Sequence, residues 1–398
     1  MFKFNFDIDD SDDQSIVCAA EESFTEEPQQ TQETVSEDVS KEVYLEHLLS
    51  ALPHTISFSP LHLSLPSQRE VVLSRRDLFD ARFQLISADD GGGNDNESSE
   101  VDFIDAPSDL VPGVYEGGLK TWECSLDLVE CLDSIYGRAI SSTIHGKRIL
   151  ELGCGTAIPS LYLFHSLFCA EPRADAGVHV HLQDYNELVL RLVTIPNVIL
   201  AWYMSPASSA YRTRALAQGS DQTGEADDED FDSASLPPDD PSQPGELAIT
   251  PALRSAFRES LKTHGIHLRL FSGAWSTFGV EQAGGPYDIL LTSETIYRTA
   301  SLNSLVDLMQ KATKAQEESA SLEDVTSRLS LSKPDSLQAL ASTQYLCLVA
   351  AKLVYFGVGG GVNEFIQAVE SASRGSVQTI WETSQGVKRC VMRVLWKS

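Results

Sequence analysis

The feature that most constrains the fold is a short apolar segment that ends in two glycines and leads into an apolar helix. The segment is Arg148-Ile-Leu-Glu-Leu, the glycines are Gly153 and Gly155, and Pro159 lies in the first turn of a helix that reaches Ala170. Proline suits a first helical turn, because the amide that it lacks would be unpaired there. This order predicts a βα unit of the nucleotide-binding kind, since glycines let the backbone approach a ligand closely.

The alternation of strands and helices continues towards the C-terminus. Further strands are predicted at 178–184, 198–204, 267–271, 287–292 and 345–352. Helices are predicted at 187–193, 250–264, from 302 onwards, and at 364–373. The chain ends in two segments around Ser384-Gln-Gly386 that predict a hairpin. We therefore expect an α/β fold, with a mostly parallel sheet covered by helices on both faces and a C-terminal antiparallel hairpin.

Acidic residues are concentrated in three stretches of the chain. The sequence has 58 acidic and 29 basic residues, a formal net charge of −29, and almost all of the excess lies in 1–40, 89–109 and 206–248. The rest of the chain is nearly neutral. This distribution argues against a nucleic-acid binder with a basic surface and against attachment to anionic lipid by a polybasic patch. No apolar run resembles a signal peptide or a membrane span, so we expect an intracellular protein.

The composition of the acidic stretches also predicts the domain organisation. They are poor in apolar residues and rich in Ser, Pro, Gly, Gln and Asp, which is typical of disorder. We expect a largely disordered N-terminal extension over 1–107, with short ordered elements at 41–85. One domain is expected over 108–398, interrupted by a disordered acidic insert at 206–248 and a polar insert at 316–338.

Acidic side chains stand where the predicted strands end, which is where ligands bind in such sheets. Asp184 follows Gly155 by 29 residues, whereas a dinucleotide site places its carboxylate about 20 residues on. Ile158 occupies the place of the third small residue of the dinucleotide motif. Glu151, before the glycines, suits a cationic ligand better than a pyrophosphate. S-adenosylmethionine has a sulfonium, an ammonium and a ribose with two hydroxyls, and it fits these residues; a tight turn without a ligand is the alternative.

Seven motifs resemble the eukaryotic protein-histidine N-methyltransferase family. They are Gly113-Val-Tyr-Glu-Gly-Gly-Leu-Lys-Thr-Trp-Glu-Cys, Glu151-Leu-Gly-Cys-Gly, Gln183-Asp-Tyr-Asn, Val193-Thr-Ile-Pro-Asn, Phe271-Ser-Gly-Ala-Trp, Asp288-Ile-Leu-Leu-Thr-Ser-Glu-Thr-Ile-Tyr and Tyr355-Phe-Gly-Val-Gly-Gly-Gly-Val. The resemblance covers about 108–398 without the two inserts, and the opening Phe-x-Phe-Asn-Phe also matches. It implies a class I S-adenosylmethionine-dependent methyltransferase with a seven-stranded sheet. The implied substrate is a histidine, at the tau nitrogen, of the large-subunit ribosomal protein numbered three. We expect a monomer in the cytoplasm and nucleus.

The resemblance also implies which residues contact the cofactor. Gln183 to Tyr185 would hold the ribose and adenine region, and Trp275 or Trp122 could offer a flat face to the adenine or could be core residues. The family usually has Asp in place of Glu151 and an acidic residue in place of Ala274, which suggests a backbone or packing role for Ala274. The full set is Thr121, Trp122, Glu123, Cys124, Ser125, Glu151, Gly153, Gln183, Asp184, Tyr185, Gly273, Ala274, Trp275 and Ser293.

The catalytic group is less constrained by the sequence. An imidazole with a pKa near 6.5 is largely neutral at pH 7 and needs little help from a base. Glu294 and Tyr297 are candidates for orienting it or taking up its proton, and a helix cap with a packed tyrosine is the alternative. Related lysine methyltransferases carry a similar element, so a lysine acceptor and a non-catalytic escort of a ribosomal protein stay open. The loop 357–361 would form a wall for the substrate peptide or a flexible turn.

Metal binding is not expected. His179 and His181 share one predicted strand, and His264 and His267 span an element boundary, but no third ligand lies near either pair in the sequence.

Overall fold

The computed structural model describes residues 39–89, 118–173, 177–220, 236–313, 337–355, 359–371 and 374–397. All of them belong to one compact unit, Glu37–Ser398. The predicted disorder at 1–38, 90–107 and 221–235, the start of the predicted domain at 108–117 and most of the predicted polar insert lie outside the described residues.

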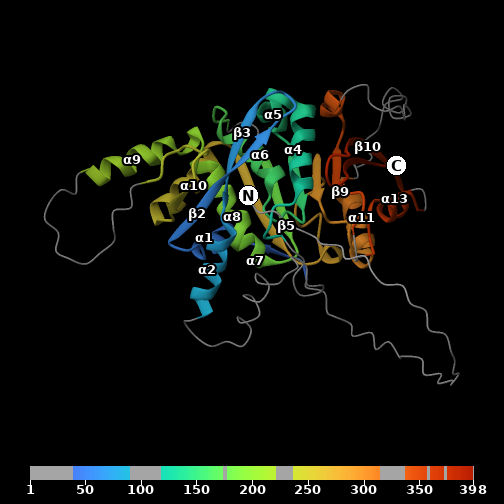
Figure 1. Cartoon of the computed structure of the whole chain (residues 1–398), viewed down its shortest axis with the longest axis horizontal. Helices are drawn as coiled ribbons and strands as arrows, with labels where there is room; N and C mark the ends of the chain where they lie inside the picture. Colours follow the sequence, from blue (N-terminus) through green and yellow to red (C-terminus); the bar gives the residue numbers. More distant parts are fainter. Residues whose placement is uncertain are drawn as a thin grey trace, which may run out of the picture. The chain divides into compact units, whose positions relative to one another are not determined.

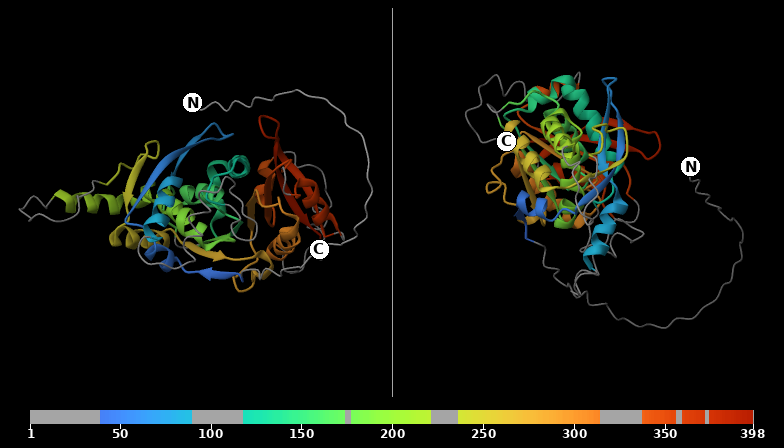
Figure 2. Two further views of the ribbon diagram at one scale, coloured as in Figure 1. Left: turned by 60° about the horizontal axis from the view of Figure 1, so that its bottom comes forward. Right: turned by 90° about the vertical axis from the view of Figure 1, so that its left-hand side faces the viewer.

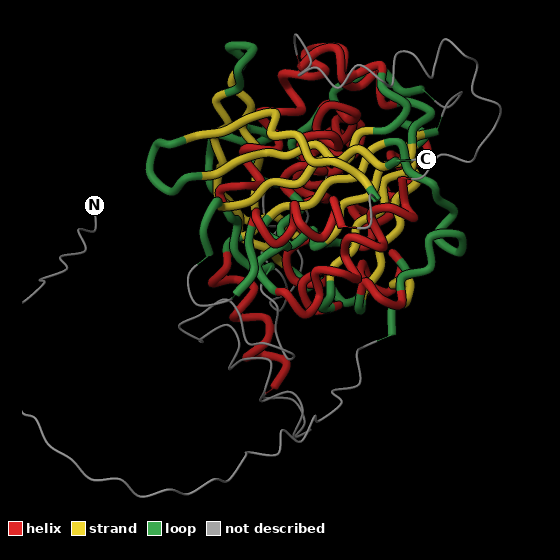
Figure 3. Tube along the Cα trace, turned by 90° about the vertical axis from the view of Figure 1, so that its right-hand side faces the viewer, coloured by secondary structure: helices red, strands yellow, loops and turns green. Residues whose placement is uncertain are grey.

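An eight-stranded sheet forms the centre of this unit, and its strands lie side by side in Figure 3. Its order is β1-β7-β5-β4-β8-β9-β11-β10. The pairs β7–β5, β5–β4, β4–β8 and β8–β9 are parallel, whereas β1, β11 and β10 are antiparallel to their neighbours. The strands are β1 (Lys41–Val43), β4 (Arg148–Leu152), β5 (Val178–Asp184), β7 (Ile266–Ser272), β8 (Ile289–Ser293), β9 (Leu346–Lys352), β10 (Gly375–Thr383) and β11 (Arg389–Trp396). The predicted parallel sheet with its closing hairpin is confirmed, with β1 as an additional edge strand.

Helices cover both faces because successive side chains of a strand point to opposite sides. In β4, Ile149 packs in one apolar cluster with α4, α6 and α8, while Leu150 and Leu152 pack in another with α11 and α13. The helices are α1 (Leu45–Ser50), α2 (Leu78–Asp89), α4 (Glu123–Tyr136), α5 (Ile140–Ile144), α6 (Ile158–Phe168), α7 (Glu187–Val189), α8 (Ile195–Tyr203), α9 (Ser209–Ser220), α10 (Pro251–Thr263), α11 (Thr299–Thr313) and α13 (Val362–Glu370), with one π turn at Leu190–Thr194 and 3-10 turns at Gly137–Ala139, Pro206–Ser208, Trp275–Thr277 and Leu337–Ser342 (Figure 1).

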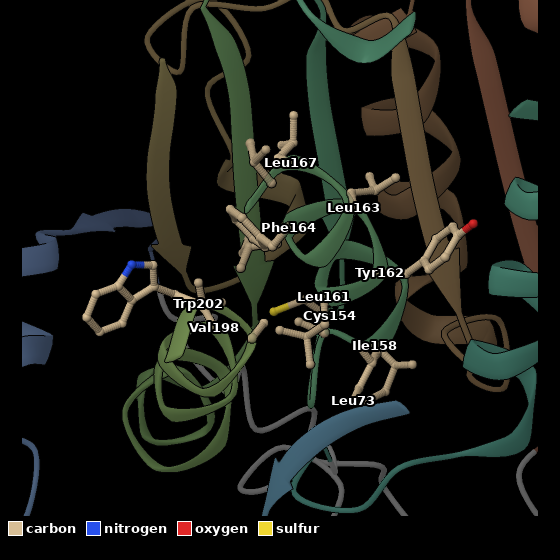
Figure 4. Packing of buried hydrophobic residues seen from close by; sticks show 14 of the residues in the cluster. Leu73, Cys154, Ile158, Leu161, Tyr162, Leu163, Phe164, Leu167, Val198 and Trp202 are labelled. Carbon is tan, nitrogen blue, oxygen red and sulfur yellow. The ribbon is translucent and has the colours of Figure 1, made fainter. Parts of the chain in front are cut away.

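A second sheet packs beside the first cluster. It has the order β3-β2-β6, all antiparallel, with β2 at Thr55–Ser64, β3 at Glu70–Arg76 and β6 at Gly245–Ala248 (Figure 2). Figure 4 shows Leu73 of β3 together with Ile158 and Leu161 of α6 and Val198 of α8. Residues 39–89 therefore share the core of the sheet, so the domain does not begin at 108 as the acidic composition led us to expect.

Two further expectations are corrected. The segment 198–204 is helical rather than a strand, because α7, the π turn and α8 continue from Glu187 to Tyr203. Its side chains Val198, Ile199 and Trp202 are fully buried, and a short run that is apolar on all sides does not distinguish a buried helix from a buried strand. The acidic insert 206–248 is partly ordered, because α9 and β6 lie within it.

Within the described residues no single helix is long and apolar enough to cross a membrane, and one bent pair, Glu187–Tyr203 with Pro206–Ala217, meets that test by length and composition only.

Candidate active site

Two glycines shape the turn that follows β4, where the order of the parallel strands reverses. Gly153 has φ +59° and Gly155 has φ +51°. A Cβ at Gly153 would lie 2.6 Å from the Cγ2 methyl of Thr295, and one at Gly155 would lie 3.0 Å from the carbonyl oxygen of Gly118. Both positions therefore require glycine for close packing as well as for conformation. The segment from Gly118 lies against this turn, and the hydroxyls of Thr121 and Thr156 are 3.1 Å apart.

Glu151 faces the helix after the turn. Its buried carboxyl accepts hydrogen bonds from the backbone N–H of Ser160, at 3.0 Å, and from the Ser160 hydroxyl. Burial raises the pKa of Glu151 to about 8, against the opposing effect of the two Ser160 bonds. In this arrangement the side chain joins β4 to α6. Its expected role towards a cationic ligand stays a prediction.

Gln183 joins three strand ends. Its Oε1 accepts the indole N–H of Trp275, at 2.8 Å, and the backbone N–H of Gly153, at 3.3 Å. Its Nε2 donates to the carbonyl of Gly273 at 2.8 Å. These bonds give the buried Gln183 a positioning role for the turns of β4 and β7, and they fix the orientation of the Trp275 ring.

Asp184 lies at the end of β5, with 6% of its surface exposed. Its Oδ2 accepts the backbone N–H of Gly155 at 2.9 Å, and its Oδ1 lies 3.3 Å from the backbone N of Asn186. The next residue, Tyr185, accepts the backbone N–H of Gly273 at 3.0 Å. The carboxylate is thus fixed beside the glycine turn, at the carboxyl ends of β4 and β5.

The turn after β7 is covered by the N-terminal segment. Gly273 has φ +103°, and a Cβ there would lie 2.7 Å from the Cα of Ser40. The backbone N–H of Ser40 also donates to the hydroxyl of Thr277, at 2.8 Å. Ala274 is buried, and its carbonyl accepts the Thr277 hydroxyl at 3.1 Å. The glycine at 273 is therefore required by contact with residues that the sequence had assigned to a separate extension.

The catalytic candidates lie where β8 ends, after Ser293. Glu294 has φ +57°, a conformation that residues other than glycine rarely adopt. Its Oε2 accepts the hydroxyl of Tyr355 at 2.8 Å, and its Oε1 lies 3.6 Å from Nζ of Lys352. Burial raises the pKa of Tyr355, and the neighbouring carboxylate raises it further, so this hydroxyl stays protonated as a donor.

Tyr297 contacts the glycine loop that follows β9. Its ring lies 6.3 Å from that of Tyr355, and its carbonyl accepts the backbone N–H of Gly360 at 3.0 Å. A Cβ at Gly360 would lie 2.5 Å from that carbonyl oxygen. Gly360 therefore packs closely against the chain itself, and the expected wall for the substrate peptide stays a prediction; residues 356–358 lie outside the described part.

The segment 121–125 reaches the same place from the N-terminus of α4. Nζ of Lys352 lies 4.5 Å from the centre of the Trp122 ring and 3.4 Å from Oε2 of Glu123. Cys124 is buried next to Glu294, and burial raises the pKa of its thiol. Ser125 donates its hydroxyl to the carbonyl of Trp122 at 2.7 Å.

Lys352 was missed by the sequence analysis, and Tyr355 was quoted there as the start of a motif but was given no role. A lysine that ends an otherwise apolar strand, with a tyrosine three residues later, is the signal that could have identified them.

The histidines lie within the sheet rather than at its carboxyl ends. The ring of His179 stacks on that of His267 at 4.5 Å, and Nδ1 of His181 lies 2.8 Å from the hydroxyl of Tyr287. Burial lowers the pKa of His181 to about 3. Over the described ranges no group of three His, Cys, Asp or Glu residues could hold a metal ion.

The predicted cofactor residues therefore meet at one edge, although they belong to five segments of the chain. The glycine turn offers backbone at close range, Asp184 offers a fixed carboxylate, and Trp275 stands beside the turn. A fixed carboxylate at a strand end beside a glycine turn suits the ribose of a nucleoside such as S-adenosylmethionine.

The chain is similar to curated proteins along most of its length. It is 31% identical to Histidine protein methyltransferase 1 of Saccharomyces cerevisiae over 383 residues, which cover 92% of this chain and 89% of that protein. It is 28% identical to the Schizosaccharomyces pombe protein of the same name, covering 89% and 84%. The match to the Rattus norvegicus homologue is 29% identical over 73% of this chain and 59% of that protein.

Comparison with solved structures and family models adds less. A ribosomal protein L11 methylase from Lactobacillus delbrueckii subsp. bulgaricus is 9% identical with a TM-score of 0.29, covering 74% of this chain and 92% of that one. Magnesium protoporphyrin IX methyltransferase from Synechocystis with bound SAM is 10% identical, also with a TM-score of 0.29, covering 77% and 99%. No family model matches the chain. The long matches to the yeast proteins, on a sheet whose strand ends carry the predicted motifs, show that the chain belongs to the histidine protein methyltransferase family.

Proposed function

We propose that this chain methylates a histidine, at its tau nitrogen, in the large-subunit ribosomal protein numbered three. Its membership of the family makes it an S-adenosylmethionine-dependent protein-histidine methyltransferase. The observation that supports histidine as the acceptor is the similarity to Histidine protein methyltransferase 1 over 92% of the chain. The choice of ribosomal protein and of nitrogen rests on the resemblance of the motifs, as do the expected monomer and its place in the cytoplasm and nucleus.

The residues that would hold the cofactor lie around the glycine turn. When bound, S-adenosylmethionine supplies a methyl group activated by a positive sulfur. Asp184 accepts the ribose hydroxyls, and the backbone at Gly153 and Gly155 passes close to the cofactor. Gln183 keeps Trp275 in place beside the turn through its 2.8 Å bond to the indole N–H.

The chain contributes mainly position to the transfer. The acceptor nitrogen must attack in line with the bond that breaks, and holding two reactants in such a geometry supplies much of the rate. A neutral imidazole already has a lone pair at pH 7, whereas a lysine ammonium must first lose a proton. A histidine acceptor therefore needs less help from a general base than a lysine acceptor does.

The charge of the chain supports a basic client. The net charge of −29 lies mostly in stretches outside the sheet, and ribosomal proteins are generally basic. Opposite charges speed association, and salt screens this effect. We expect the association rate to fall as salt rises, and deletion of residues 221–235 to reduce that dependence. If the salt dependence of the association rate does not change, these residues do not contribute to attracting the substrate.

Amino-acid analysis tests the acceptor. Unmodified ribosomal proteins are incubated with the enzyme and radiolabelled S-adenosylmethionine, hydrolysed, and the labelled amino acid is identified. Methyl-histidine in protein three supports the proposal, and methyl-lysine would overturn it.

A matched pair of variants separates the site from the fold. Asp184→Ala should abolish transfer, whereas Glu259→Ala, at a carboxylate on α10 with 72% of its side chain exposed, should not change it. If the wild type does not bind S-adenosylhomocysteine in calorimetry, neither a histidine nor a lysine methyltransferase activity is supported.

A further inference from the structure

Glu294 has a buried oxygen that lacks a hydrogen bond. Only 8% of its side chain is exposed, and Oε2 is occupied by the hydroxyl of Tyr355. Oε1 has no hydrogen-bond partner among the described residues; Nζ of Lys352 forms an ion pair with it at 3.6 Å, and the buried thiol of Cys124 lies next to the carboxyl group. Buried polar atoms are nearly always paired, so an exception calls for a ligand or another explanation. This oxygen can accept one more N–H or O–H.

The backbone places the carboxylate of Glu294 beside the glycine turn at Gly153. Glu294 keeps φ +57° while its N–H donates to the carbonyl of Ala350 at 2.9 Å. The next residue, Thr295, has its methyl against Gly153. Unfavourable backbone conformations persist where the surroundings fix them, and they are concentrated at functional sites. The carboxylate is thus attached one residue away from the contact that defines the glycine turn.

Two residues at the end of β9 hold the carboxylate, and we call Lys352 and Tyr355 the carboxylate clamp. The Tyr355 hydroxyl donates to Glu294 and also accepts the backbone N–H of Lys352 at 3.2 Å. The Lys352 ammonium lies between Glu294 and Glu123, over the ring of Trp122. Tyr355, Lys352 and the buried Cys124 therefore surround the carboxylate of Glu294.

The clamp reaches solvent on one side. Lys352 has 16% of its side chain exposed and Glu123 has 53%. Oε1 of Glu294 is itself buried, so contact with a substrate requires the neighbouring side chains to move.

A neutral imidazole presents one N–H and one nitrogen with a free lone pair. We propose that Oε1 of Glu294 accepts the N–H of the substrate histidine, which turns the other nitrogen towards the methyl group, and that the carboxylate clamp positions Glu294 for this contact. This inference rests on the function proposed above. It makes Glu294 the group that selects which of the two nitrogens is methylated.

The transfer balances without a further reactant. The imidazole lone pair forms the new N–C bond while the electron pair of the S–C bond leaves with the sulfur. The product is a methylimidazolium that still carries its N–H against Glu294. That proton passes to the carboxylate or to water as the product leaves.

Product isomers provide the test. Glu294→Gln retains the size of the side chain, but its amide can donate as well as accept, so it no longer distinguishes the two nitrogens. Unmodified recombinant ribosomal protein three is methylated by the wild type, by Glu294→Gln, by Tyr355→Phe and by the control Glu259→Ala. Tau- and pi-methylhistidine are then separated after hydrolysis, and the affinity for S-adenosylhomocysteine is measured by calorimetry.

We expect one isomer from the wild type and the control. For Glu294→Gln we expect a selectivity between the isomers that is lower by about tenfold or more, since a hydrogen bond to a charged group is lost. Its kcat should fall while its affinity for S-adenosylhomocysteine stays within about twofold of that of the wild type. Tyr355→Phe should shift the isomer ratio in the same direction by a smaller factor, because it frees the carboxylate without removing it.

A single unchanged isomer from Glu294→Gln, at any rate of transfer, would overturn the inference and leave the proposed function standing. If that variant does not fold, the isomer ratio of Tyr355→Phe decides in the same way. Methyl-lysine from the wild type would overturn the proposed function itself, and this inference with it.

Discussion

The contact between Gly153 and Thr295 allows a quantitative test of how closely the chain packs at the glycine turn after β4. Gly153→Ala adds a Cβ at φ +59°, 2.6 Å from the Thr295 methyl. The left-handed conformation costs a residue with a Cβ about 1–2 kcal/mol, and forced overpacking costs about 1–3 kcal/mol more. We therefore expect the variant to lose about 2–5 kcal/mol of unfolding free energy and to bind S-adenosylhomocysteine more weakly, because the turn must shift.

Gly146 provides the matched control. It lies in the turn before β4, with φ +78°, and a Cβ there would meet nothing within 4 Å. Gly146→Ala should therefore lose only the conformational part, about 1–2 kcal/mol, and keep its affinity for S-adenosylhomocysteine. The effect of alanine on the unfolded chain is common to both variants, so it cancels in their difference.

A double-mutant cycle isolates the steric part. Thr295→Ser removes the methyl but keeps the hydroxyl, which lies 2.7 Å from that of Thr292. In the Gly153→Ala background it should restore about 1–3 kcal/mol and most of the lost affinity. Unfolding is followed in denaturant and binding by calorimetry. If Gly153→Ala is no worse than Gly146→Ala, or if the cycle shows no coupling, the close approach of Thr295 to the glycine turn is refuted.

Three further outcomes are expected. Asp184→Asn should weaken S-adenosylhomocysteine binding by about tenfold to a hundredfold in calorimetry, because a charged acceptor of the ribose hydroxyls is lost, and an unchanged affinity would contradict the ribose role. The pKa of Glu42 is lowered, mainly by its hydrogen bond to Arg269, so the stability that this pair adds is present above pH 4.5 and is lost as the pH falls. Glu42→Gln should therefore be less stable than the wild type at pH 7, and the unfolding curves of the two proteins should converge in acid. Burial raises the pKa of Glu151 from 4.5 to about 8, so rising pH should destabilise the wild type relative to Glu151→Gln between these values, and parallel pH profiles would show that Glu151 ionises normally.

The sequence predicted the central sheet well because the strands are short, apolar and separated by turn residues. Periodicity failed at 198–204, where every side chain is apolar and neither period shows. The boundary expected at 108 was wrong because residues 39–89, which include β2 and β3 and precede an acidic stretch, pack into the core. At β6, a strand of four residues joins a sheet although its neighbours in the chain are acidic. Contacts between segments more than two hundred residues apart, such as β1 with β7, have no local pattern in the sequence.

The site was predictable in position more than in detail. Strand ends at the reversal of the sheet indicated where the cofactor residues would meet, and motif resemblance supplied their identity. The sequence could not show that Gln183 hydrogen bonds to Trp275, Gly153 and Gly273, or that Glu151 faces Ser160. Those bonds depend on side-chain directions that are fixed only when the strands are packed.

The strand β1 has a practical consequence for any shortened form of the protein. A chain that begins at 108, where the composition suggests a boundary, would lack the partner of β7 and expose its whole edge. Unpaired sheet edges are templates for self-association, so such a chain should form aggregates even if its catalytic motifs are intact. The turn at Gly273 would also lose the backbone of Ser40 that packs against it. Truncation studies would then report the loss of a sheet edge as if it were the loss of a regulatory region.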